Sequence, residues 1–189
     1  MGKQDIAYMQ AAKILKERHR HERNMRRIPA TLSNGDDIAL LASKQDVLVK
    51  KVILDLCSLY APAGRVLSVS DGTGKWAYFD DAALKELGID IAEHGKMPNV
   101  VVHHVEKDWL VLIEAVTSHG PVNPKRRREL KELFAGSKIG LVFVTAFLER
   151  RAMIKYLNDI SWETEVWVAE SPTHLIHFNG ERFLGPYED

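Results

Sequence analysis

Three nearly uninterrupted apolar segments constrain the fold of this chain more than any other feature. They cover residues 99–105, 109–116 and 138–147, with the sequences NVVVHHV, WLVLIEAV and KIGLVFVTAF. Each is short and rich in β-branched residues, which favours a strand over a helix. A strand with one face in water alternates apolar and polar residues, whereas these segments do not. We therefore expect three strands at the centre of a sheet that is covered on both faces.

The segment before this centre predicts a long helix that packs on the sheet. Ser43 is a suitable N-cap for a helix over residues 44–60. Apolar residues recur along that segment at helical spacing, which indicates one buried face. The residues expected on this face are Val47, Leu48, Val52, Leu56 and Leu59.

The remaining segments complete an α/β fold. A helix over residues 123–136 separates the second and third apolar strands, which predicts a right-handed crossover and a parallel pairing. Residues 65–71 and 75–79 predict a β-hairpin around a glycine-rich turn. Further predicted elements are a strand over 38–41, a helix over 81–87 ended by Gly88, a helix over 149–159, and strands over 165–169 and 175–178. We expect a mixed sheet sandwiched by helices, with an αβββαβ core.

The size and composition of the chain fit one compact domain with an appendage. It has 189 residues, of which 46% are hydrophobic, so it can bury a sizeable core. Its single cysteine, Cys57, allows no internal disulfide and indicates a reducing compartment. No run of about 18 apolar residues occurs, and the N-terminal segment is too charged for a signal peptide. We therefore expect a cytoplasmic protein without a membrane partner.

The charge of the chain is balanced in total but unevenly distributed. The net charge is zero, yet residues 3–27 hold eight basic and three acidic residues, and a second basic cluster covers 125–128. Apolar residues at helical spacing predict a helix over 4–27 that Pro29 ends. We expect an N-terminal basic helix over 1–28 and a main domain over 29–189. Such clusters are typical of phosphate-backbone contacts, but also of solvated helix faces.

Two polar residues interrupt the central strands and point to metal chemistry. Asn99 precedes the first apolar strand, and Glu114 lies near the end of the second. Neighbouring strands are about 4.8 Å apart, so such residues can converge on a divalent cation such as Mg²⁺. Mg²⁺ can activate water and stabilise the leaving oxygen of a phosphodiester. A second interpretation of Glu114 is an ion pair with Lys125 or Arg126.

Several long sequence words resemble one protein family. They are KWAYFD (75–80), HGKMPNVVV (94–102), WLVLIEAVTSHGPVNPKRRREL (109–130), GLVFVTAF (140–147) and WETEVWVAESPTHLIHFNGERFLGPY (162–187). With them, residues 28–187 resemble the catalytic C-terminal region of the BsuBI/PstI restriction endonucleases, in the PD-(D/E)XK nuclease superfamily. The resemblance implies Mg²⁺-dependent cleavage of double-stranded DNA by a type II enzyme that reads a hexanucleotide palindrome. It also implies a homodimer and a cognate DNA methyltransferase in the same restriction–modification system.

The chain departs from the implied pattern at two positions. The family has Asp after the proline, where this chain has Asn99, whose amide oxygen brings no negative charge to a metal. Val116 stands where the superfamily usually has a catalytic lysine, so the cation must come from Lys75, Lys125 or Arg126. The chain is then either a nuclease silenced by Asn99, or an inactive DNA-binding or assembly module. A small-molecule or RNA-directed hydrolase is a third hypothesis.

The resemblance and the sequence together predict a set of site residues. The predicted catalytic residues are Asn99, Glu114, Lys125 and His119, with His119 as a phosphate contact or general base. The predicted metal ligands are Asn99, Glu114 and Asp71, and Asp46 is the predicted accessory acid. The predicted DNA contacts are Lys75, Arg126, Arg127, Arg128, Arg23, Arg26 and Arg27. Asp46 and Asp71 fit helix-cap or turn roles equally well. Full-length family members carry a further helical domain, so we expect either a fragment or a shortened relative.

Overall fold

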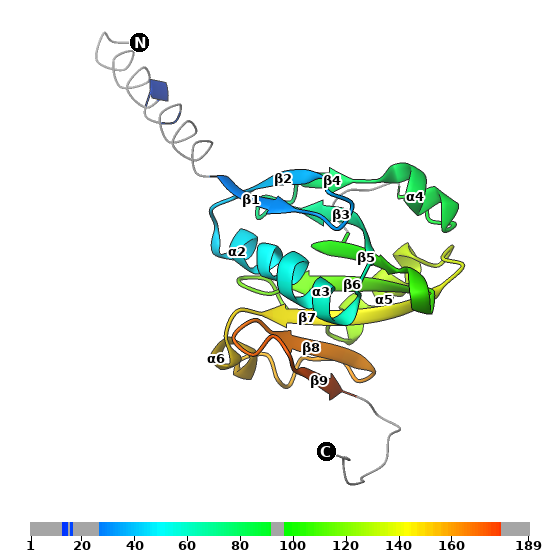
Figure 1. The fold of residues 1–189 in the computed structure, drawn as a ribbon. Helices are drawn as coiled ribbons and strands as arrows, with labels where there is room; N and C mark the ends of the chain where they lie inside the picture. The colour runs from blue at the N-terminus through cyan, green and yellow to red at the C-terminus, as the bar shows by residue number, and fades with distance from the viewer. Residues whose placement is uncertain (1–12, 15, 17–26, 92–96, 179–189) are drawn as a thin grey trace, which may run out of the picture.

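The computed structural model describes residues 13, 14, 16, 27–91 and 97–178, and its centre is a seven-stranded mixed sheet (Figure 1). The strand order is β4-β3-β5-β6-β7-β8-β9. The three apolar segments form the adjacent strands β5, β6 and β7, as predicted. The strands are β3 (Arg65–Ser70), β4 (Trp76–Phe79), β5 (Val100–His104), β6 (Trp109–Ala115), β7 (Gly140–Phe147), β8 (Thr164–Val168) and β9 (Leu175–Phe178).

The pairing of the central strands brings the start of β5 and the ends of β6 and β7 to the same edge of the sheet. β5 and β6 are antiparallel, with Val100 opposite Ile113, whereas β6 and β7 are parallel. The parallel pair is joined through helix α5 (Pro124–Leu133), and the predicted parallel pairing is confirmed. The start of β5 therefore lies beside the ends of β6 and β7.

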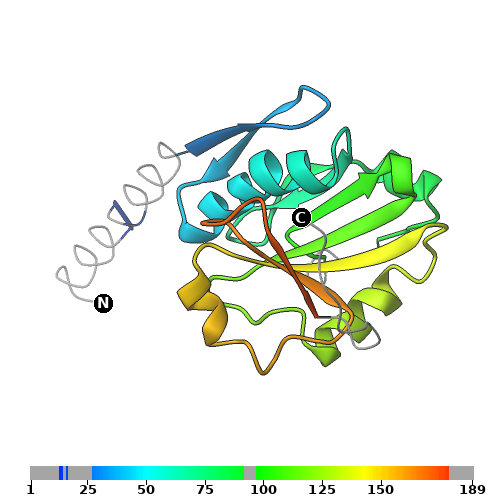
Figure 2. The ribbon, with the colours of Figure 1, turned by 60° about the horizontal axis from the view of Figure 1, so that its bottom comes forward.

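Helices cover both faces of this sheet, so the predicted α/β fold is confirmed (Figure 2). The continuous helical segment α2 (Lys44–Lys51), η1 (Val52–Leu56) and α3 (Cys57–Tyr60) packs on one face. Helices α4 (Asp81–Glu86) and α5 pack on the other. Side chains alternate accordingly, since Val100 and Val102 face the first layer and Val101 faces the second. A third cluster lies under α6 (Arg150–Ile154).

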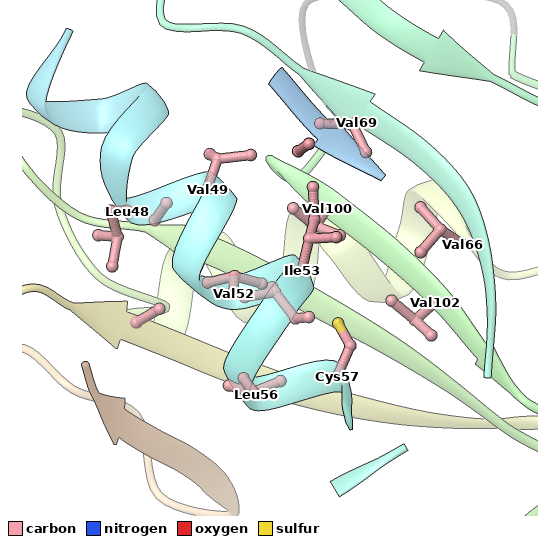
Figure 3. Packing of buried hydrophobic residues seen from close by; sticks show 14 of the residues in the cluster. Leu48, Val49, Val52, Ile53, Leu56, Cys57, Val66, Val69, Val100 and Val102 are labelled. Atoms are coloured by element: carbon pink, nitrogen blue, oxygen red, sulfur yellow. The ribbon is translucent and has the colours of Figure 1, made fainter. Parts of the chain in front are cut away.

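The long helix over residues 44–60 forms as predicted, but its buried face differs from the prediction. Ser43 caps it by accepting a hydrogen bond from the Asp46 N–H at 3.1 Å. Val47 and Leu59 were predicted in the core and are instead exposed. Leu59 is exposed because the π-helical turn η1 before it holds more residues per turn than an α-helix and rotates the face that follows, whereas Val47 precedes η1 and lies on the solvent side of α2. The buried apolar residues on this helix are Leu48, Val49, Val52, Ile53, Leu56 and Cys57 (Figure 3).

The N-terminal part of the described chain differs from the prediction at Arg27. A strand, β1 (Arg27–Thr31), begins there and pairs with β2 (Asp37–Leu41) in a separate two-stranded sheet. Pro29 lies within β1, where its missing N–H is tolerated because β1 has one partner strand. Residues 13, 14 and 16 are helical and exposed, and the rest of the predicted basic helix lies outside the described residues.

The other predicted elements form with small changes of length. Gly88, which follows α4, has a φ of 84°, a left-handed conformation that suits a helix end. Helix α6 covers five residues, and the remainder of the predicted helix over 149–159 is a series of turns. Across the described residues, no helix has the length and apolar character needed to cross a membrane.

Candidate active site

Asn99 and Glu114 lie together at the sheet edge where β5 begins and β6 ends. The Asn99 Oδ1 atom accepts a hydrogen bond from the Ala115 N–H at 2.8 Å. Its Nδ2 group donates to the Ser70 Oγ atom at 3.4 Å. Asn99 thus ties β5 to both neighbouring strands. Asn99 and Glu114 also line one cavity of about 280 Å³, together with Gln45, Asp71 and His119.

Glu114 is a nearly buried carboxylate that is held by an arginine. Its side chain is 15% exposed, and the Arg126 Nε and Nη2 atoms both lie 2.7 Å from its Oε1 atom. Burial raises the pKa of the Glu114 carboxyl above its ordinary value, while the Arg126 and His119 charges oppose that shift. Of the two ion-pair partners that the sequence offers for Glu114, the structure therefore uses Arg126.

The start of α5 directs Arg126 towards Glu114. The Asn123 side chain caps the helix by accepting from the Arg126 N–H at 2.8 Å. The Val122 N–H donates to the Thr145 Oγ1 atom at 3.1 Å, which fixes this helix end against β7. The Arg126 guanidinium consequently projects to the end of β6. A second cavity, of about 370 Å³, opens here between α5 and the sheet edge.

Glu129 contacts both Lys125 and Arg126 and lines the second cavity together with Glu114. Its Oε2 atom lies 3.5 Å from the Arg126 Nη1 atom, and its Oε1 atom lies 3.8 Å from the Lys125 Nζ atom. The Lys125 side chain is 79% exposed, so it contacts the second cavity from solvent. His119 lines both cavities and is exposed.

The two predicted acids, Asp46 and Asp71, both have structural contacts. Asp46 is fully buried, accepts a hydrogen bond from the Gly72 N–H at 3.0 Å, and accepts another from the Ser43 hydroxyl. Its carboxylate therefore joins the start of α2 to the turn between β3 and β4. Asp71 lines the 280 Å³ cavity, and its Oδ1 atom accepts three hydrogen bonds from Thr73 and Lys75.

The residue of α2 that does line the cavity is Gln45, which sequence reasoning missed. Its Oε1 atom accepts a hydrogen bond from the Thr117 hydroxyl at 3.0 Å. Gln45 immediately precedes Asp46, the residue predicted as the accessory acid, which does not line this cavity. The sequence offers one clue that Asp46 does not face the cavity. Asp46 lies three residues after the N-cap Ser43, and its N–H and its carboxylate both bind Ser43 in the helix cap.

Val116, at the position where the superfamily usually has a lysine, is buried in the third cluster. The other basic residues predicted for the site lie in different parts of the structure. Arg127 pairs with Glu163, and its guanidinium lies 5.7 Å from the centre of the Phe143 ring. Arg128 and Arg27 are exposed, and Lys75 lies in the turn after Asp71. Arg23 and Arg26 lie outside the described residues.

The described side chains fit a divalent cation only incompletely as they stand. Among the described residues, no three His, Cys, Asp or Glu side chains gather around a point that could hold a metal. The predicted ligands at this edge are the carboxylates of Glu114 and Asp71 and the neutral amide of Asn99, and Gln45 and Ser70 line the same cavity. Both Arg126 donors end on the Glu114 Oε1 atom, so Arg126 must move before that oxygen can bind a cation.

Comparison with known proteins places this geometry in a family. The family model of the BsuBI/PstI restriction endonuclease domain matches residues 28–181. The chain belongs to the BsuBI/PstI restriction endonuclease domain family. The resemblance inferred from the sequence words is thereby confirmed, and both residue 99 and residue 114 fall inside the matched BsuBI/PstI domain.

Individual relatives of the BsuBI/PstI family match over almost the whole chain. The chain is 50% identical over 181 residues to the type II restriction enzyme BsuBI of Bacillus subtilis, covering 96% of the chain and 57% of that enzyme. It is 30% identical over 177 residues to the type II restriction enzyme AplI of Arthrospira platensis, covering 90% and 54%. The structure of the SdaI restriction endonuclease aligns with a TM-score of 0.82 at 43% identity, over 92% of this chain and 55% of that one. The chain thus spans somewhat more than half the length of these relatives.

Proposed function

We propose that this chain is a catalytic domain of the type II restriction endonuclease kind, with a PD-(D/E)XK core, that hydrolyses phosphodiester bonds in double-stranded DNA with Mg²⁺. One observation supports this proposal above the others. Asn99 and Glu114, from adjacent central strands, face the same cavity at one edge of the sheet. Family membership makes phosphodiester hydrolysis the expected chemistry for that edge.

Each residue at the edge has a role in this proposal. Glu114, Asp71 and the amide oxygen of Asn99 would hold Mg²⁺, which when bound supplies activation of water and stabilisation of the leaving oxygen. Arg126 is the cation that α5 holds at this edge, beside Glu114, so it takes the charge-stabilising role proposed for a superfamily lysine. His119, at the wall of both cavities, contacts a phosphate or accepts a proton. Lys125 and Arg128 contact the DNA backbone.

Asn99 sets how active this site is. The resemblance implies Asp at this position, and the two side chains have nearly the same shape. A carboxylate at position 99 could accept from the Ala115 N–H as Asn99 does, and from the Ser70 hydroxyl, which lies 3.4 Å from the present Nδ2 group. Its second negative charge would raise cation affinity, since hard cations prefer charged oxygen ligands. We therefore propose that Asn99 attenuates cleavage without disturbing the fold.

Plasmid cleavage tests the proposal. Supercoiled plasmid is incubated with Mg²⁺ or Mn²⁺ and the native chain, the Asn99→Asp chain, or the Asn99→Asp/Glu114→Gln double variant. We expect Asn99→Asp to cut about 100-fold faster than the native chain, and the double variant to lose this gain. If folded Asn99→Asp protein leaves the plasmid intact with millimolar Mn²⁺, the endonuclease proposal is wrong.

A second candidate is an inactive DNA-binding or assembly module that keeps the fold. It is favoured by the neutral amide of Asn99 together with the Arg126 ion pair that already satisfies Glu114. In that case native and Asn99→Asp chains bind duplex DNA equally in fluorescence anisotropy, and neither cuts. The nuclease proposal requires instead that the two differ in cleavage.

The proposed activity also carries partners and a location. Cutting both strands needs two sites, so we propose a homodimer on duplex DNA. A restriction activity needs a cognate DNA methyltransferase to protect host DNA, and both would act in the cytoplasm. Sedimentation of the chain with a short duplex tests the dimer, because a single copy per duplex contradicts it.

A further inference from the structure

Four charged side chains form a chain of contacts from the sheet edge along α5. The Arg126 Nε and Nη2 atoms bind the Glu114 Oε1 atom at 2.7 Å. The Arg126 Nη1 atom lies 3.5 Å from Glu129, and Glu129 is also 3.8 Å from Lys125. Arg126 therefore stands between two carboxylates, one nearly buried and one half-exposed, and contacts the buried one more closely.

This arrangement leaves Arg126 in competition with a divalent cation. Both of its donors end on the same Glu114 oxygen, which is among the atoms offered to the cavity shared with Asn99. A guanidinium and a divalent cation repel each other at such a short distance. Binding of a cation at this Oε1 atom would displace Arg126, whose charge would then need another anionic partner.

Glu129 is placed to receive the withdrawn guanidinium. It lies one helical turn beyond Arg126, where side chains three residues apart are neighbours, and the Nη1 atom already faces it. A rotation of the outer part of the Arg126 side chain shortens that contact while it vacates Glu114. The guanidinium keeps a carboxylate partner throughout, which avoids leaving a partly buried charge unpaired.

We propose that Glu129 is a positioning residue for the cation site, because it takes over Arg126 when Glu114 turns to a divalent cation, and so sets how tightly that cation binds. The inference rests on the proposed function, since it assumes cation binding at Glu114. It goes beyond that function by assigning a role to a residue outside the ligand set.

The test measures Mn²⁺ binding rather than cleavage. Free Mn²⁺ is followed by electron paramagnetic resonance during titration of the native and Asn99→Asp chains at pH 8.5. In each chain we expect Glu129→Gln to weaken binding about tenfold and Glu129→Asp to recover most of it. Glu132→Gln is the matched control, because it removes the same charge from an exposed position on the same helix. We expect Glu132→Gln to change affinity less than about twofold.

A double-mutant cycle separates positioning from simple charge effects. We expect Arg126→Met to tighten Mn²⁺ binding, and the effect of Glu129→Gln to shrink to that of Glu132→Gln in the Arg126→Met background. Equal effects of the two glutamates, or an effect of Glu129→Gln that persists without Arg126, would overturn the inference. Circular dichroism melting of each variant checks that the fold is retained.

The same titration distinguishes failure of this inference from failure of the proposed function. If Glu114→Gln leaves Mn²⁺ binding unchanged, the cation site itself is wrong and both proposals fall. If binding depends on Glu114 and on Glu129 through Arg126, yet plasmid stays intact in Asn99→Asp, only the endonuclease function fails. If Asn99→Asp cuts DNA while Glu129 has no effect, only the positioning role fails.

Discussion

At the scale of single residues, the polar groups of the candidate site are also structural. Asn99 binds Ala115 and Ser70 across three strands, and Asp46 joins α2 to the turn after β3. A Cβ atom at Gly72 would lie 2.6 Å from the Ser43 Oγ atom and 2.9 Å from the Asp46 Oδ2 atom, so the buried carboxylate also dictates a glycine. These contacts fix the cavity wall independently of any bound cation.

Asp80 gives a pH-dependent prediction at the same scale. It caps α4 by accepting from the Ala83 N–H at 3.0 Å and pairs with Arg65 at 2.7 Å. The Ala83 hydrogen bond and the Arg65 charge hold the pKa of the Asp80 carboxyl below its ordinary value, against a smaller opposing effect of burial. A lowered native pKa stabilises the fold above the unfolded pKa of about 3.9, and this contribution is lost as pH falls through the native value.

We therefore expect Asp80→Asn to reduce the difference in free energy of unfolding between pH 7 and pH 3. Asparagine keeps the capping acceptor but does not titrate, so the variant loses stability mainly at pH 7. Urea unfolding at both pH values measures the effect. Asp81→Asn, at the neighbouring position, is the comparison: its carboxylate pairs with Lys85 at 2.7 Å but is 55% exposed, so we expect a smaller reduction there. An equal loss at pH 7 and pH 3 in Asp80→Asn would contradict the electrostatic explanation.

The sequence indicated Asn99 and Glu114 as neighbours in the candidate site, but it did not indicate which basic residue contacts Glu114. Asn99 and Glu114 stand out because a polar residue in an apolar strand requires a partner, and strand pairing then places them together. The choice of Arg126 over Lys75 and Lys125 depends on the direction of α5, which Asn123 and Thr145 fix in three dimensions. No spacing rule in one sequence expresses such a direction.

At the scale of elements, the helix over residues 44–60 shows how local geometry decides what is buried. The π-helical turn η1 rotates the end of this helix, so that Cys57 is buried at 8% exposure and Leu59 is exposed at 49%. A regular helical pattern predicts the helix itself but not this rotation. Likewise, β1 was missed because a charged segment with a proline resembles a loop, and its strand conformation comes from pairing with β2.

The adjacent pair Ile53 and Leu54 provides a matched test of the buried face of this helix. Ile53→Ala removes buried methyl groups from the cluster against Val100 and Val102, and we expect it to cost about 2–4 kcal/mol. Leu54→Ala should cost less than about 1 kcal/mol, because that side chain is half exposed. Urea unfolding curves measure both values. Similar costs at the two positions would contradict the buried face that the structure gives this helix.

At the scale of the whole molecule, the basic cluster of α5 separates into different roles. Arg126 turns to Glu114, and Arg127 turns to Glu163 and Phe143, so neither is available to solvent as a simple phosphate contact. Lys125 and Arg128 are exposed near the helix start, which is the end of α5 beside the candidate site. Because the net charge of the chain is zero, attraction to the DNA backbone would depend on such a local basic cluster and not on the total charge.

Salt dependence of DNA binding distinguishes these roles. The logarithm of the association constant falls linearly with the logarithm of salt concentration, with a slope of about 0.9 for each neutralised phosphate. We expect Lys125→Ala and Arg128→Ala each to reduce this slope by about one contact in anisotropy titrations of a duplex. Arg127→Ala should leave the slope unchanged and lower stability instead, by about 0.5–1 kcal/mol, because its charge already pairs with Glu163. Lys131→Ala removes an equally exposed charge from the last turn of α5, so a slope change there as large as at Lys125 would assign the effect to total charge rather than to phosphate contacts.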